Sequence, residues 1–178
     1  MKDKNNISRR NFIKLTAAGT AALTVVPHYL FSDENKTLDS KGLPTRKFGR
    51  TGIEVPLIGI GTGSRFLSID SLDKSDEVLN YALDHGVYYW DTAASYDWDG
   101  RNSEERLGRV LKHRRKEVWL STKLSKRNGD EAMRQFESSL KKLQTDYLDE
   151  LKIHSVAEEE GDVDKILKPG NVYDVVRK

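Results

Sequence analysis

Four residues with side chains suited to acid–base chemistry stand at related places in the sequence. Asp91, Lys123 and His154 each follow a short, largely apolar run, and Tyr96 follows Asp91 in a loop of small and polar residues. Tyrosine is a weak acid, with a reference pKa of about 10. An ammonium group beside a phenol favours the phenolate and makes the phenol a stronger acid. The set is therefore typical of an acid that protonates an oxygen on which negative charge develops.

The other three residues can each support that acid. Lys123 can supply the ammonium group, and Asp91 can keep it charged, because a buried lysine otherwise tends to lose its proton. His154 can donate a hydrogen bond to a carbonyl oxygen. Reduction of a carbonyl group by hydride needs such an arrangement, and the hydride has to come from a cofactor.

The spacing of these residues indicates the elements that must position them. Gly61, Asp91, Lys123 and His154 follow one another at intervals of about 31 residues, the length of one strand-plus-helix unit. Such a repeat, with a special residue at each strand end, predicts a TIM (β/α)8 barrel, in which the strand ends meet at one mouth. The expected elements are a hairpin over 45–55, strands over 56–60, 87–90, 117–121 and 147–153, and helices over 74–85, 103–111, 130–143, 163–167 and 172–177.

The length of the chain allows only the first four βα units of such a barrel. Residues 45–178 are available for it, whereas a closed barrel needs about 250 residues. We therefore expect half a barrel that is a fragment of a longer protein, since four parallel strands leave two unpaired edges. A complete, small, doubly wound sheet is the alternative, but it gives no reason for one reactive residue at each strand end.

The composition argues against several classes of protein. The chain has no cysteine, which excludes disulfides, thiol catalysis and a cysteine-based metal site. Its four histidines, at 28, 85, 113 and 154, do not have the spacing of metal ligands, so we expect no metal. The 30 basic and 28 acidic residues are interspersed, and the net charge is +2, so we expect no nucleic-acid partner.

The N-terminal residues form a distinct segment. Arg9 and Arg10 precede an apolar run over 15–26 that is too short to span a bilayer. The segment 8–14 resembles the twin-arginine export motif, and this implies the export machinery as a partner and passage across the inner membrane. The protein would then be periplasmic, or anchored by an uncleaved signal as its only membrane contact. A basic amphipathic helix of the fold is the alternative.

These observations divide the chain into three parts. We expect a signal over 1–31, a polar linker over 32–44 and the half barrel over 45–178.

Several motifs resemble those of the aldo-keto reductases, in the order that family has them. They cover residues 47–52, 59–62, 90–96, 103–108, 121–123 and 152–154. The resemblance implies the N-terminal half of that family's barrel and hydride transfer between NADPH, or NADH, and an aldehyde or ketone. It also implies that Tyr96 is the general acid, that Lys123 and Asp91 tune it, and that His154 orients the substrate carbonyl.

The resemblance also implies positions for the cofactor and the substrate. Gly61, Thr62 and Asp91 would line the nicotinamide side, and Phe66 and Trp98 are weaker candidates for the wall of the substrate pocket. The family binds much of its cofactor through strands five to eight. We therefore expect the 178-residue polypeptide alone to be inactive.

Two other functions remain open from the residues alone. One is a barrel lyase with Lys123 as Schiff-base nucleophile, although that chemistry needs a neutral amine and Asp91 opposes it. The other is a non-catalytic binding subunit that keeps the barrel without turnover.

Overall fold

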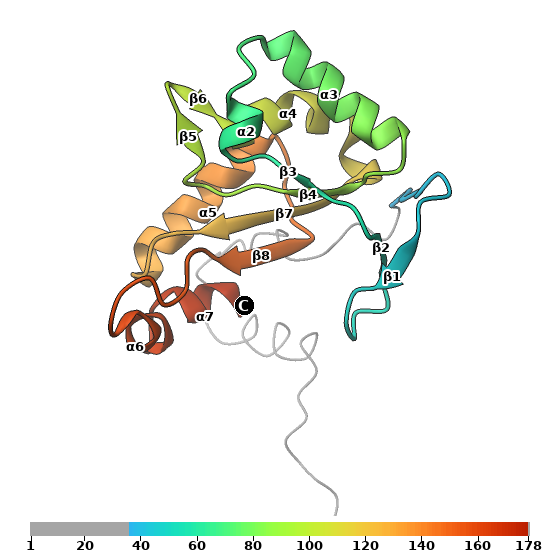
Figure 1. Ribbon diagram of the computed structural model, residues 1–178. Helices are drawn as coiled ribbons and strands as arrows, with labels where there is room; N and C mark the ends of the chain where they lie inside the picture. The colour runs from blue at the N-terminus through green and yellow to red at the C-terminus, as the bar shows by residue number, and fades with distance from the viewer. Residues whose placement is uncertain (1–35, 178) are drawn as a thin grey trace, which may run out of the picture.

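The computed structural model describes residues 36–177 and shows a partial α/β barrel (Figure 1). Its central sheet has four parallel strands in the order β3-β4-β7-β8. These strands are β3 (Ile60–Gly61), β4 (Tyr89–Asp91), β7 (Trp119–Leu124) and β8 (Glu150–Ile153). Neighbours in the sheet are also neighbours in the chain, which confirms the expected series of βα units.

Three long helices connect these strands. They are α3 (Leu72–Asp84), α4 (Ser103–Arg114) and α5 (Gly129–Leu143), and they lie on the same side of the sheet (Figure 1). A doubly wound sheet would carry helices on both faces, so the arrangement is that of a barrel wall. The remaining helices are α2 (Ser64–Leu67), η1 (Arg115–Glu117), α6 (Asp162–Leu167) and α7 (Val172–Val176).

The ends of the helices are fixed by polar residues in the sequence. The side chain of Asn102 accepts a hydrogen bond from the backbone of Glu105 at the start of α4, and Asn128 caps α5 in the same way. Such caps satisfy backbone N–H groups that have no partner within the helix. At the other end of α5, Gln144 adopts a left-handed conformation with φ 53° and stops the helix.

The core lies between the sheet and these helices. Trp90 from β4 and Leu120 from β7 are fully buried in it. A Cβ atom at Gly108 of α4 would stand 2.2 Å from the carbonyl oxygen of Lys142 in α5. The glycine is therefore required by the contact between the two helices.

The N-terminal hairpin is confirmed, but the first barrel strand is shorter than expected. The hairpin consists of β1 (Thr45–Lys47) and β2 (Glu54–Pro56), which pair antiparallel. The predicted strand over 56–60 is only Ile60–Gly61, and Leu57 and Ile58 are each 59% exposed. The backbone N–H of Leu57 donates to Pro44, so the hairpin extends into the start of the apolar run.

Three small elements were not predicted. They are the helix α2, the short helix η1 and a hairpin made of β5 (Asp97–Trp98) and β6 (Arg101–Asn102). Gly100, with φ 71°, and Asp99, with φ 54°, form its turn. This hairpin rises from the loop that carries Tyr96.

The segment expected to be a polar linker contacts the barrel where it is described. Lys36 donates a 2.6 Å hydrogen bond to the carbonyl oxygen of Val118, and its ammonium group lies 2.5 Å from Asp149. The backbone N–H of Thr37 donates to Lys116. The expected signal over 1–31 lies outside the described residues. Within residues 36–177, no helix has the length and apolar character needed to cross a membrane.

Candidate active site

The four residues predicted to act together lie at the same end of the sheet. Asp91 ends β4, Lys123 lies near the end of β7, and His154 directly follows β8. Tyr96 lies in the loop after β4. Parallel strands bring their carboxyl ends to one edge, which is why residues so far apart in sequence meet.

Lys123 is the centre of the group. Its ammonium nitrogen lies 2.5 Å from Oδ2 of Asp91 and donates a 2.7 Å hydrogen bond to the carbonyl oxygen of Thr92. The same nitrogen is 3.4 Å from the phenol oxygen of Tyr96 and 4.9 Å from the centre of that ring. Lys123 therefore links the carboxylate to the phenol, as the sequence predicted.

His154 approaches the phenol from the neighbouring strand. The rings of His154 and Tyr96 meet edge to face, with centroids 5.7 Å apart and an interplanar angle of 88°. The Nδ1 atom of His154 and the hydroxyl group of Ser155 are 2.5 Å apart, which fixes the ring. This contact leaves Nε2 as the ring nitrogen that is able to bind a substrate oxygen.

A second lysine also binds Asp91. The ammonium nitrogen of Lys152 lies 3.1 Å from Oδ1 of Asp91, so the carboxylate is shared between two cations. Burial would raise the pKa of Asp91, but the hydrogen bonds from Lys123 and Lys152 outweigh it, and the pKa lies below its ordinary value. Asp91 is therefore ionised throughout the neutral range.

Lys152 is held by a further layer of polar groups below Asp91. It donates a 3.0 Å hydrogen bond to the hydroxyl group of Tyr89 and lies 3.4 Å from Glu150. Tyr89 in turn donates to Glu150 at 2.7 Å. Burial would lower the pKa of Lys152, but its bonds to Tyr89 and Asp91 outweigh this and raise the pKa well above its ordinary value.

Gly61 and Thr62, the residues at the end of β3 that were predicted to line the cofactor, differ in their exposure. Gly61 is exposed, and a Cβ atom there would meet nothing within 4 Å, so open space lies beside Asp91 at this strand end. Thr62 is fully buried, and its hydroxyl group donates to the carbonyl oxygen of Asp91 and bonds to Ser103. The Thr62 side chain is therefore buried inside the barrel wall, where it stabilises the backbone at Asp91.

Buried polar contacts also join the start of α4 to β7. The hydroxyl group of Thr122 donates a 2.7 Å hydrogen bond to Glu104, whose side chain is buried. Burial raises the pKa of Glu104, and the bond from Thr122 lowers it, with burial prevailing. This contact lies next to Lys123 in the sequence, and it fixes the strand end against the helix.

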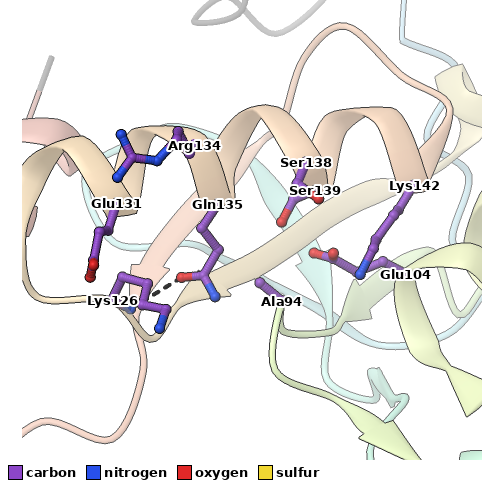
Figure 2. A pocket seen from close by; sticks show the side chains of 9 residues that line it. All are labelled: Ala94, Glu104, Lys126, Glu131, Arg134, Gln135, Ser138, Ser139 and Lys142. Atoms are coloured by element: carbon purple, nitrogen blue, oxygen red, sulfur yellow. Dashed lines mark hydrogen bonds between the residues drawn. The ribbon is translucent and has the colours of Figure 1, made fainter. Parts of the chain in front are cut away.

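Glu104 also faces a pocket of about 380 Å3 between α4 and α5 (Figure 2). The pocket lies on the helix side of the sheet. Its other lining residues are Ala94, Lys126, Glu131, Arg134, Gln135, Ser138, Ser139 and Lys142. None of the four predicted catalytic residues lines it, so it is separate from the candidate active site.

The two weaker pocket candidates take different places. Phe66 is only 5% exposed and belongs to the hydrophobic core, where the guanidinium group of Arg106 lies 6.0 Å from its ring. It is therefore a core residue and does not form an open wall. Trp98, on the β5–β6 hairpin, is 51% exposed. Its side chain is therefore open to solvent beside the loop that carries Tyr96.

Lys152 was not predicted to take part in this site. The signal for it was present, because Lys152 lies two residues before His154 and side chains at that spacing share one face of a strand. Within residues 36–177, no group of three or more histidine, aspartate or glutamate side chains could hold a metal ion.

Comparison with known proteins gives a consistent result. The model of the aldo/keto reductase family matches residues 57–168, and that of the twin-arginine translocation pathway signal sequence matches residues 6–26. A curated relative is the aldo-keto reductase YhdN of Bacillus subtilis, 35% identical over 120 residues. That match covers 58% of this chain and 35% of YhdN, so the chain spans about a third of its relative.

Solved structures of similar proteins agree. A putative aldo-keto reductase from Pseudomonas aeruginosa has a TM-score of 0.58 and 29% identity, over 72% of this chain and 52% of that one. An aldo-keto reductase from Klebsiella pneumoniae, solved in complex with NADPH, has a TM-score of 0.53 and 31% identity. That match covers 64% of this chain and 41% of the Klebsiella chain.

Proposed function

Because this chain belongs to the aldo/keto reductase family, we propose that it carries the catalytic half of an NAD(P)H-dependent reductase of aldehydes or ketones. One observation carries the proposal. The ammonium group of Lys123 contacts both the carboxylate of Asp91, at 2.5 Å, and the phenol of Tyr96, at 3.4 Å. This is the geometry that an acid needs when it gives up a proton near neutral pH.

The proton in this reaction comes from Tyr96. Its hydroxyl group passes the proton to the carbonyl oxygen of the substrate, which becomes an alcohol oxygen. The positive charge of Lys123 stabilises the phenolate that remains, and Asp91 keeps Lys123 charged. Nε2 of His154 donates a hydrogen bond to the same carbonyl oxygen and holds it beside the phenol.

The residues at the strand ends fit a nicotinamide ring. A Cβ atom at Gly61 would meet nothing within 4 Å, so there is room at this strand end, where Gly61 pairs with Asp91. We propose that Gly61 and Asp91 bind this ring, which supplies a hydride to the carbonyl carbon. The Klebsiella relative solved with NADPH supports NADPH as the cofactor.

The cofactor must also be held by its phosphates. In barrels of this kind, phosphate sites generally lie near strands seven and eight, and the described sheet has four parallel strands. We therefore expect a polypeptide limited to these 178 residues to show no turnover. Activity would require the part of the barrel that its relatives have beyond the matched region.

The signal sequence adds a location to this function. Its match at residues 6–26 implies export across the inner membrane by the twin-arginine machinery, which carries folded proteins. We propose that the reductase folds and binds its cofactor before export, and then acts in the periplasm either free or anchored by its signal.

A lyase that uses Lys123 as a nucleophile is not favoured by the geometry. A Schiff base forms from a neutral amine, whereas the Lys123 ammonium lies against Asp91 at 2.5 Å. Borohydride treatment with a carbonyl substrate separates the two functions, because it would attach that substrate to Lys123 only in a lyase.

The proposal is tested with the complete reading frame that contains these 178 codons. The purified product should oxidise NADPH in the presence of a panel of small aldehydes and ketones. The variant Tyr96→Phe should lose this reaction, whereas Tyr173→Phe, which changes an exposed tyrosine of α7, should keep it. Equal rates in both variants would contradict the proposal.

A further inference from the structure

The placement of Lys152 is unusual for a residue with no assigned function. Lys152 lies directly opposite Lys123 in the register of β7 and β8. Two like charges at facing positions of neighbouring strands destabilise a sheet. Here the carboxylate of Asp91 lies between them, 2.5 Å from one ammonium group and 3.1 Å from the other. Repulsion between the two lysines would weaken the sheet, so their placement requires an explanation.

Lys152 is also held more firmly than a surface lysine. Its ammonium group contacts Asp91, the hydroxyl group of Tyr89 and the carboxylate of Glu150. Its side chain is 33% exposed, so the charge is partly removed from water. Three oxygen atoms from two strands therefore fix the position of this charge.

We propose that Lys152 is a positioning residue for the candidate acid: by holding one oxygen of Asp91, it strengthens the positive charge that Lys123 presents to Tyr96. Asp91 has one negative charge to share. When Lys152 takes part of it, Asp91 neutralises Lys123 less completely. The phenol of Tyr96 then faces a more positive environment, which stabilises its phenolate.

The surroundings of Tyr96 support this direction. The titratable groups that face the phenol or its partners are Lys123 on β7, Asp91 and Tyr89 on β4, Glu150 and Lys152 on β8, and His154 after β8. Asp97 follows Tyr96 in the chain and is exposed. Glu150 lies 3.4 Å from Lys152, farther than Asp91 at 3.1 Å, and it also accepts a hydrogen bond from Tyr89, so it draws less on the Lys152 charge than Asp91 does.

The inference rests on the proposed function, since it assigns Lys152 a part in the acidity of Tyr96. Its test, however, needs no turnover. In the complete protein, the ring carbon that bears the hydroxyl group is labelled with 13C in every tyrosine, and the signal of Tyr96 is identified by its absence in Tyr96→Phe. The pH at which this signal titrates is then compared between variants.

Four variants make the comparison decisive. Lys152→Met and Lys152→Gln remove the charge and should move the ionisation of Tyr96 to higher pH. Lys152→Arg keeps the charge and should leave the titration of Tyr96 close to that of the parent protein. Lys141→Met removes an exposed charge from α5 and should leave the titration unchanged.

The outcomes separate this inference from the function on which it rests. A titration that is the same in Lys152→Gln, Lys152→Met and the parent protein overturns the inference, even if the protein reduces carbonyls. The same shift in Lys152→Arg as in Lys152→Gln also overturns it, because the charge would then not be the cause. If the expected shift is found in a protein with no reductase activity, the electrostatic effect of Lys152 on Tyr96 is upheld and the proposed reductase function is contradicted.

Discussion

Thr122, the residue directly before Lys123, donates a 2.7 Å hydrogen bond from its hydroxyl group to the buried carboxyl group of Glu104. The contact joins the first turn of α4 to the end of β7. It therefore ties the strand that carries Lys123 to the helix that follows the Tyr96 loop. The position of the ammonium group relative to the phenol depends in part on this bond.

Glu104 should make the folding stability depend on pH in an unusual direction. Its pKa is raised in the folded state, so the folded protein binds this proton more tightly than the unfolded chain. Its stabilising effect is complete below the unfolded pKa and is lost as pH rises through the folded pKa. Glu104→Gln should therefore be as stable as the parent in acid and more stable at pH 8, by about 1 kcal/mol.

Urea unfolding at several pH values measures this difference. Glu105→Gln, which changes the exposed neighbour, is the control and should follow the parent at every pH. A Glu104→Gln variant that is less stable than the parent at pH 8 would show that the charged carboxylate is required.

Asp91 should show the opposite dependence. Its pKa is lowered, and it accepts hydrogen bonds from Lys123 and Lys152. Its stabilising effect is present above the unfolded pKa and is lost as pH falls through the folded pKa. Asp91→Asn should reduce the free energy of unfolding at pH 7 by about 2 kcal/mol, and the difference should shrink below about pH 4.

Urea unfolding at several pH values also measures the effect of Asp91→Asn. Asp146→Asn, at an exposed site, is the control. If the loss in Asp91→Asn had the same size at pH 3 and pH 7, the ion pairs with the two lysines would not be its cause.

The buried carboxylate of Asp149 should be important for stability at the opposite end of the sheet. Its side chain is fully buried and contacts Lys36 at 2.5 Å and Arg115 at 2.9 Å. Replacement by alanine leaves two largely buried cations without their anion, and such losses cost about 3–5 kcal/mol. Thermal unfolding should show a large decrease in Tm for Asp149→Ala.

The matched control is Glu159→Gln. The carboxylate of Glu159 lies 2.5 Å from Lys165, but its side chain is 66% exposed. Solvent screens such pairs, so this variant should unfold with the parent. A small loss in Asp149→Ala would mean that residues 36–40 do not pack on the barrel in solution.

Gly108 should be difficult to replace. A Cβ atom at this position would lie 2.2 Å from the carbonyl oxygen of Lys142, and backbone atoms cannot move aside cheaply. Gly108→Ala should therefore destabilise the protein by about 1–3 kcal/mol, although alanine is the better helix former. Gly61→Ala, where the added atom meets open space, should change stability little. Urea unfolding of both variants is the measurement, and a stabilised Gly108→Ala would contradict the helix contact.

The sequence predicted the barrel type and the meeting of the four residues because both follow from one repeat length. Asp91, Lys123 and His154 recur with the strand-plus-helix period, and each strand end brings its residue to the same mouth. The start of the sheet could not be read in the same way. The run over 56–60 is apolar throughout, and nothing in its composition shows that the hairpin extends into its first residues.

The role of Lys152 could be read only in part from the sequence. Its spacing from His154 indicates a shared strand face, but its place opposite Lys123 depends on the register between β7 and β8. A shift of one residue would turn its side chain to the other face of the sheet. Likewise, the burial of Phe66 depends on the short helix α2, and four residues carry too little pattern to predict a helix.

The most direct test of the proposed chemistry is the rate of hydride transfer to a reducible aldehyde in the complete protein, measured in single turnover with Tyr96→Phe. The residues described here predict that this variant binds NADPH like the parent and loses at least about 100-fold in rate, the usual contribution of a general acid. Hydride transfer at the parental rate in Tyr96→Phe would contradict the assignment of Tyr96 as the proton donor.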